Sequence, residues 1–91
     1  MSAVSRAVLI TNKRGLHARA SAKFVTMASG LGTIVEVEKD GSKVVGTSIM
    51  GLMMLGAAKG DTIIISADGA DGAAAVDALA DLVEAKFHEA E

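Results

Sequence analysis

One segment decides the fold, Thr33-Ile34-Val35-Glu36-Val37-Glu38-Lys39-Asp40-Gly41-Ser42-Lys43-Val44-Val45. Apolar and polar residues alternate along residues 33–38, as they do in a strand that buries one face. Asp40-Gly41 is a strong two-residue hairpin signal, and residues 42–45 can return as the partner strand. The segment therefore predicts an antiparallel β-hairpin near the middle of the chain.

A strand and a helix are predicted before this hairpin. Residues 4–11 form a strand-length run with several β-branched residues, which stops at the turn-prone residues 12–15. From His17 onward the apolar residues recur at steps of three or four, as on one face of a helix, and Gly30 and Gly32 close that helix. The apolar face carries Leu16, Ala20, Phe24, Met27, Ala28 and Leu31.

A short helix, a strand and a final helix are predicted after the hairpin. Ser48 can cap a helix of two to three turns over residues 49–58, which a glycine then stops. Residues 62–65 read as a strand, and the loop 68–72 leads into the last helix with Asp71 as its cap. The apolar stripe of that last helix carries Val76, Leu79, Val83 and Phe87.

The predicted order βαββαβα indicates an α+β fold. Four short strands and three amphipathic helices are most simply arranged as a four-stranded antiparallel sheet whose one face the helices cover, a two-layer open-faced β-sandwich. Ninety-one residues fit one domain over residues 1–91. We expect loose ends only in the first few residues and in the acidic tail, residues 88–91.

Composition excludes several functional classes. A net charge of −2, with Phe24 and Phe87 as the only aromatic residues, argues against a nucleic-acid partner. The absence of cysteine and the presence of two histidines argue against disulfides, a metal site or a metal cofactor. The apolar run 49–58 is too short to span a bilayer, and residues 1–6 do not resemble a secretory signal. We therefore expect a cytoplasmic protein without membrane insertion and without a cofactor.

The candidate reactive group is His17, at the start of the first predicted helix. An anion bonded to its ring would face unpaired backbone N–H groups and the positive end of the helix, and Arg19 adds a guanidinium. A neutral imidazole is a good nucleophile toward phosphorus, and the same positive charges stabilise a bound phosphoryl group. The alternative is that His17 only caps the helix while Arg19 is solvated.

A second helix start, at Ser48, also suits an anion, and an apolar cluster follows it. Six large apolar side chains in seven positions exceed what one face of a short helix can bury, so some of them should form a docking surface. Flexible methionines suit a surface that meets several partners. The cluster comprises Ile49, Met50, Leu52, Met53, Met54 and Leu55.

Two motifs carry a family resemblance, Ile10-Thr11-Asn12-Lys13-Arg14-Gly15-Leu16-His17-Ala18-Arg19 and Ser48-Ile49-Met50-Gly51-Leu52-Met53-Met54-Leu55-Gly56. With them, nearly the whole chain resembles the histidine-containing phosphocarrier family, HPr, of the bacterial phosphoenolpyruvate-dependent phosphotransferase system. Two relatives with different outputs fit this pattern, the sugar-transport branch and the nitrogen-related regulatory branch. The sequence departs from the family pattern at Ala20, where a proline usually follows the active-site arginine.

The resemblance implies a stoichiometric phosphoryl carrier and not an enzyme. His17 would accept a phosphoryl group from phosphorylated enzyme I on Nδ1 and pass it to a IIA protein or domain, and Arg19 would stabilise that group. Ser48 would be the regulatory serine that an HPr kinase/phosphorylase phosphorylates, although a plain helix cap is the competing interpretation. Partner docking would use Leu16, Ile49, Met50, Leu52 and Met53, and the carrier is expected to be a monomer.

Two other functions stay open on the sequence. A small hydrolase of the acylphosphatase kind also uses an arginine and a phosphate cradle, but it needs an asparagine to orient water, and the only candidate is Asn12. A non-catalytic regulatory module would bind partners through residues 49–55 without carrying phosphate.

Overall fold

The central hairpin forms where the sequence predicts it in the computed structural model, which describes residues 3–89. Strand β2 (Val35–Lys39) pairs antiparallel with β3 (Ser42–Val45), and Lys39 lies opposite Ser42. Asp40 and Gly41 have φ angles of 51° and 85°, the pair of positive values that a type I′ turn requires.

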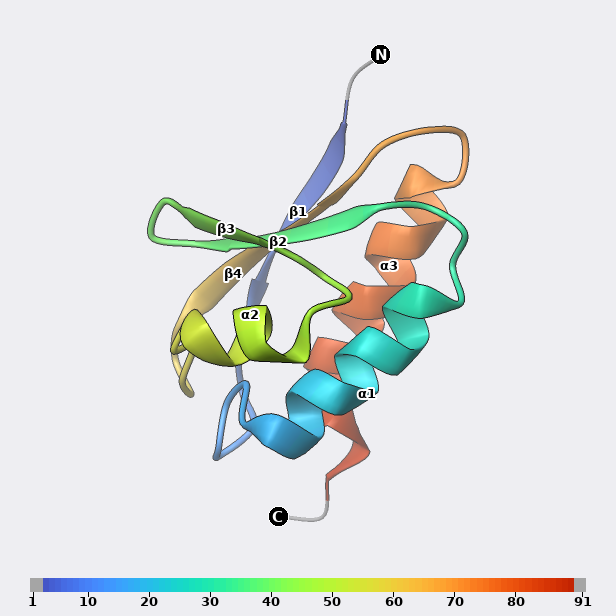
Figure 1. Cartoon of the computed structure of the whole chain (residues 1–91). Coiled ribbons are helices and arrows are strands. Elements are labelled where there is room, and N and C mark those ends of the chain that lie inside the picture. Colours follow the sequence, from blue (N-terminus) through green and yellow to red (C-terminus); the bar gives the residue numbers. More distant parts are fainter. Residues whose placement is uncertain (1–2, 90–91) are drawn as a thin grey trace.

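The other two strands complete a four-stranded antiparallel sheet with the order β1-β4-β2-β3 (Figure 1). Strand β4 (Thr62–Ala67) lies between β1 (Val4–Leu9) and β2, so the first and last strands of the sheet are neighbours. Side chains alternate along β4: Ile63, Ile65 and Ala67 are buried, and the residues between them are more exposed. One face of the sheet is therefore in the core, as the alternation predicts.

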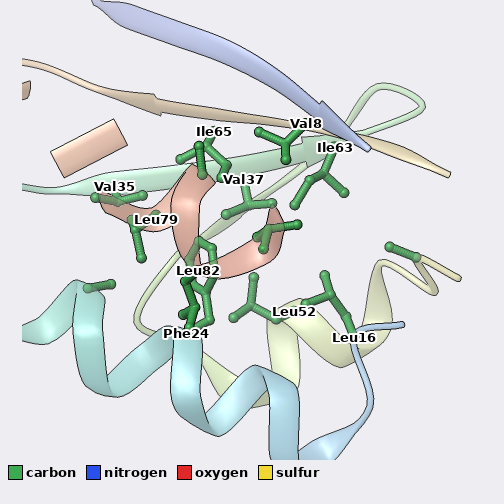
Figure 2. Packing of buried hydrophobic residues seen from close by; sticks show 14 of the residues in the cluster. Val8, Leu16, Phe24, Val35, Val37, Leu52, Ile63, Ile65, Leu79 and Leu82 are labelled. Carbon is green, nitrogen blue, oxygen red and sulfur yellow. The ribbon is translucent and has the colours of Figure 1, made fainter. Parts of the chain in front are cut away.

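Three helices cover that face (Figure 1). They are α1 (Ala18–Ser29), α2 (Ile49–Met54) and α3 (Gly72–Glu84), and a short turn of 3-10 helix, η1 (Lys86–His88), follows α3. Phe24 of α1, Leu52 of α2 and Leu79 of α3 are fully buried against the sheet (Figure 2). The order βαββαβα and the two-layer α+β architecture are thus confirmed. No helix within residues 3–89 is long and apolar enough to cross a membrane.

Several boundaries differ from the sequence-based expectation. Helix α2 ends at Met54 instead of extending to residue 58, because the chain turns at Gly56 with a φ of 66°. Strand β1 ends at Leu9, two residues before the predicted end, whereas β4 continues to Ala67. Asp71 does occupy the cap position of α3, but its side chain makes no capping hydrogen bond.

The expectation of a loose acidic tail is wrong for the part that the structure describes. Phe87 is fully buried, and its carbonyl oxygen accepts a hydrogen bond from Nζ of Lys23 on α1 at 2.7 Å. Glu89 hydrogen-bonds to residues of the first loop and helix. Residues 90 and 91 of the expected tail lie outside the described residues, as do residues 1 and 2 of the other end.

The start of α1 is fixed by a close backbone approach at Gly15. Gly15 has a φ of 60°, and a Cβ atom there would lie 2.2 Å from the carbonyl oxygen of Ala57 and 2.8 Å from the Cα of Ala58. The same carbonyl accepts a hydrogen bond from the backbone N–H of Leu16 at 3.0 Å. Only glycine fits this contact, which sets the position of the helix that follows.

Gly15→Ala should destabilise the fold by about 2 kcal/mol or more, because the substitution adds a left-handed alanine and forces the backbone of residues 57–58 to move. Gly56→Ala is the matched control, since Gly56 has a similar φ of 66° but open space where its Cβ would lie. It should cost about 1 kcal/mol. Urea unfolding at neutral pH measures both; equal losses would show that the close approach contributes nothing.

Candidate functional site

His17 is the N-cap of α1, and this position determines how its ring is held. Its backbone is extended, with φ −72° and ψ 178°, and its carbonyl oxygen accepts the first helical hydrogen bond, from the N–H of Ser21 at 2.9 Å. The ring folds back over the helix end, so that Nδ1 accepts a hydrogen bond from the backbone N–H of Arg19 at 3.3 Å. Nδ1 therefore lies at the positive end of the helix.

The other ring nitrogen contacts a residue far along the chain. Nε2 of His17 lies 2.5 Å from Oε2 of Glu89, and the two side chains are only 15% and 12% exposed. Figure 1 shows the geometric origin of the contact: the described chain ends beside the start of α1 after crossing below the sheet in α3. The imidazole is thus held at both nitrogens.

Asn12 joins this pair to the turn before α1. Its Nδ2 donates to the other carboxylate oxygen of Glu89, Oε1, at 3.1 Å and to the carbonyl oxygen of Gly15 at 2.9 Å. Asn12 is fully buried, and its Oδ1 has no hydrogen-bond partner within the described chain. Two acceptors thus fix the orientation of the amide, even though one buried oxygen stays unsatisfied.

Opposing effects act on the carboxyl group of Glu89. Burial raises its pKa, but the hydrogen bonds from His17 and Asn12, together with the charges of His17 and Lys23, outweigh burial and hold the pKa below its usual value. Because the pKa is depressed in the folded chain, this group stabilises the fold above the pKa of an unfolded glutamate. The contribution is lost as the pH falls through the lower pKa of the folded state.

An unusual turn brings Glu89 to the site. Lys86, Phe87 and His88 all have positive φ angles, of 57°, 55° and 57°, so the chain makes a left-handed turn directly after α3. Such a conformation is costly for residues other than glycine and persists only where tertiary contacts stabilise it. Here these contacts are the burial of Phe87 and the hydrogen bond from Lys23.

Arg19 lies in the first turn of α1 with its side chain exposed. Its guanidinium makes no hydrogen bond or ion pair with residues 3–89, so within that range it is available to an anion. No group of three or more His, Cys, Asp or Glu side chains in this range is arranged to hold a metal ion.

Ser48 caps α2, because its Oγ accepts a hydrogen bond from the N–H of Gly51 at 3.0 Å. The apolar side chains that follow divide between core and surface. Four of them lie on the surface, and we call these residues the apolar patch. They are Ile49 (42% exposed), Met50 (72%), Met53 (44%) and Met54 (79%).

Two residues of the expected docking set are not on the surface. Leu52 is fully buried and Leu16 is only 4% exposed. Figure 2 shows both side chains directed toward the core, because Leu16 precedes the buried face of α1 and Leu52 occupies the inner face of α2. The docking prediction is therefore corrected for these two residues, which support the surface from below.

The sequence-based prediction of the candidate site omits Asn12 and Glu89. On the sequence, Asn12 is a candidate only for orienting water in a hydrolase, whereas its side chain hydrogen-bonds to Gly15 and Glu89. Glu89 is 72 positions from His17, and nothing in an acidic tail indicates which residue it contacts. The spacing of short motifs carries no information about contacts at this separation.

Comparisons with known proteins agree on one family. A family model described as the PTS HPr component phosphorylation site matches residues 4–85. Phosphocarrier protein HPr of Neisseria meningitidis is 52% identical over 88 residues, which cover 97% of this chain and 99% of the relative. Phosphocarrier protein NPr of Shewanella violacea is 41% identical over 90 residues, or 99% of both chains.

Solved structures show the same fold. An HPr crystal structure from Thermoanaerobacter tengcongensis superposes with a TM-score of 0.87 at 46% identity and covers 100% of both chains. A second structure from that organism, described as an HPr dimer, has a TM-score of 0.75 at 49% identity and covers 90% of this chain and 94% of its own. These likenesses show that the chain belongs to the HPr family of phosphocarrier proteins of the phosphotransferase system.

Proposed function

We propose that this protein carries phosphoryl groups on Nδ1 of His17, taking them from phosphorylated enzyme I and passing them to a IIA protein or domain. The observation that supports this most is the position of Nδ1, which meets the backbone N–H of Arg19 at the positive end of α1. A phosphoryl group brings about two negative charges to that position. Backbone N–H groups and the helix dipole stabilise such charges there.

The protein acts as a stoichiometric carrier and not as a turnover catalyst. A histidine phosphate stores the group between two transfers, so the site has to bind it well enough to accept it and loosely enough to release it. The exposed guanidinium of Arg19 suits this requirement, because an unpaired cation at the rim can reach the phosphoryl oxygens without enclosing them. Phosphoryl transfer depends largely on such positioning and charge stabilisation.

The apolar patch is the proposed docking surface for both partners. Its four side chains are exposed on α2, and three of them are methionines, which adapt to partners of different shape. Ser48 lies directly before the patch. Phosphorylation of Ser48 by an HPr kinase/phosphorylase would place charge beside this apolar surface and weaken docking.

A single domain over residues 1–91 and a monomeric carrier remain part of this proposal. Both branches of the system use the same histidine chemistry, and the relatives include proteins named HPr and NPr. We therefore propose the carrier role for either output, sugar transport or nitrogen-related regulation.

His17→Ala should abolish labelling when the protein is incubated with enzyme I and radiolabelled phosphoenolpyruvate. The wild type should gain one acid-labile phosphoryl group per chain, located on Nδ1 by 31P NMR. His88→Ala, which removes the other histidine, should be labelled normally. Absence of label on the wild type would exclude the carrier role, and steady hydrolysis of acetyl phosphate would favour the hydrolase alternative.

Arg19→Ala should slow transfer from phosphorylated enzyme I about tenfold or more, because it removes a cation that stabilises the transferred group. Its free energy of unfolding should change by less than about 0.5 kcal/mol, as for other exposed side chains. Quench-flow and urea unfolding provide the two measurements. Arg6→Ala, on β1, is the control for loss of one positive charge and should transfer at the normal rate. Equal slowing by both variants would show that the rate depends on net charge and not on the position of Arg19.

Ser48→Asp should weaken binding to enzyme I about tenfold, which corresponds to roughly 1.4 kcal/mol. The cause is a charge beside the apolar patch, so Ser48→Asn, which keeps the capping oxygen without a charge, should bind normally. Isothermal titration calorimetry measures both affinities. Equal affinities for the two variants would contradict the regulatory role and leave Ser48 as a helix cap.

A further inference from the structure

We propose that Glu89 is a positioning residue for phosphoryl transfer: its carboxylate keeps the proton of His17 on Nε2, which leaves the lone pair of Nδ1 free for phosphorus. This inference rests on the proposed carrier function and extends it to a residue outside the two sequence motifs. It also explains why a costly left-handed turn follows α3, since that turn carries Glu89 to the ring.

The two partners of the imidazole assign its proton. The backbone N–H of Arg19 can only donate, so Nδ1, which faces it at 3.3 Å, has to be the unprotonated acceptor. An ionised carboxylate can only accept, so Nε2, at 2.5 Å from Oε2 of Glu89, has to carry the hydrogen. Both contacts independently select the same tautomer, the one in which Nδ1 is the nucleophile.

The carboxylate is itself held in place. Nδ2 of Asn12 donates to Oε1 of Glu89 at 3.1 Å, which leaves Oε2 for the ring. Asn12 is anchored in turn by its bond to the carbonyl of Gly15, the residue that fits only as glycine against Ala57. Burial of Phe87 and the bond from Lys23 to its carbonyl oxygen anchor Glu89 from the other side.

The same contact balances charge during transfer. The lone pair of Nδ1 forms the new N–P bond while the bond from phosphorus to the donor breaks, and that electron pair leaves on the donor. The proton stays on Nε2, so the phosphorylated ring becomes a cation beside the carboxylate of Glu89. The ring nitrogen is then a good leaving group when the acceptor attacks, and the neutral tautomer returns after transfer. This arrangement resembles the histidine–carboxylate pairs of other sites, in which the second partner fixes tautomer and orientation.

Glu89→Gln is the informative substitution because it keeps the shape of the side chain and changes which groups donate. Nδ2 of Asn12 requires an acceptor, so the amide oxygen of glutamine should face Asn12 and its NH2 group should face His17. Nε2 would then have to accept, which favours a proton on Nδ1, the reacting nitrogen, at the cost of the hydrogen bond from the N–H of Arg19. Glu89→Ala removes the partner altogether and leaves only the N–H of Arg19 to favour the Nε2–H tautomer.

The first measurement needs no partner protein. Long-range 1H–15N correlation spectra of the full chain, at a pH where His17 is neutral, report which ring nitrogen carries the hydrogen. The wild type should show predominantly the Nε2–H tautomer. Glu89→Gln should show the largest share of the Nδ1–H tautomer, and Glu89→Ala an intermediate share, because the N–H of Arg19 still favours an unprotonated Nδ1. The matched control is Glu84→Gln, which neutralises another acid near the end of α3 that pairs with Arg6 at 3.2 Å; it should keep the wild-type tautomer.

The second measurement is the rate of phosphoryl transfer from phosphorylated enzyme I. Glu89→Gln should slow it about tenfold or more, the size typical of substitutions that disturb the partner of a reactive histidine. Glu89→Ala should slow it less than Glu89→Gln, whereas a merely structural role would make the larger truncation the more harmful one. Glu84→Gln should transfer at the wild-type rate.

The outcomes separate this inference from the carrier function. A wild type that is phosphorylated on His17 but carries its ring hydrogen on Nδ1 would overturn the role of Glu89 and leave the carrier function intact. Unchanged tautomer and rate in Glu89→Gln would do the same. A wild type that is not phosphorylated at all would reject the carrier function, while the tautomer spectra would still show whether Glu89 directs the proton.

Discussion

The close approach of Gly15 to Ala57 is the contact on which the candidate site depends. It brings the turn before α1 against the loop that precedes β4, the central strand next to β1. At that contact the N–H of Leu16 donates to the carbonyl oxygen of Ala57, and the side chain of Leu16 packs in the core. His17, the next residue, lies at the edge of the core. The position of the His17 ring is therefore a consequence of backbone packing, which a single methyl group at residue 15 would disrupt.

Much of the fold could be predicted because its signals are local. The alternation before Asp40-Gly41 predicts the hairpin, and the periodicity after His17 predicts α1, although Leu16 and Leu31 at the two ends of the predicted apolar face lie outside the helix. The weaker predictions failed where tertiary structure decides. A continuous apolar run does not reveal that the chain turns at Gly56, and a residue in the cap position, such as Asp71, need not use its side chain.

Only the residues of the candidate site that lie in short local motifs could be predicted. His17, Arg19 and Ser48 lie at helix starts, and helix starts can be recognised from short motifs. Burial is harder to assign, because adjacent apolar residues of α2 divide between the core and the apolar patch according to the direction of each side chain. The contacts of Glu89 and Asn12 lie beyond any such reasoning, since they join opposite ends of the described chain through the assembled core.

The contact between Glu89 and the His17 ring can open and close through a few residues, because the left-handed turn over Lys86–His88 carries Glu89 to the ring. Helix α3 and the sheet already bring this segment next to α1, so the entropy of closing a loop between positions 17 and 89 has been lost before the carboxylate arrives. Opening the contact therefore requires only local release of residues 86–89 while the sheet stays folded. Hydrogen exchange at these amides would then report the free energy of local opening, which is smaller than the free energy of unfolding of the whole domain. The same smaller free energy would set how long the carboxylate of Glu89 stays beside the imidazole.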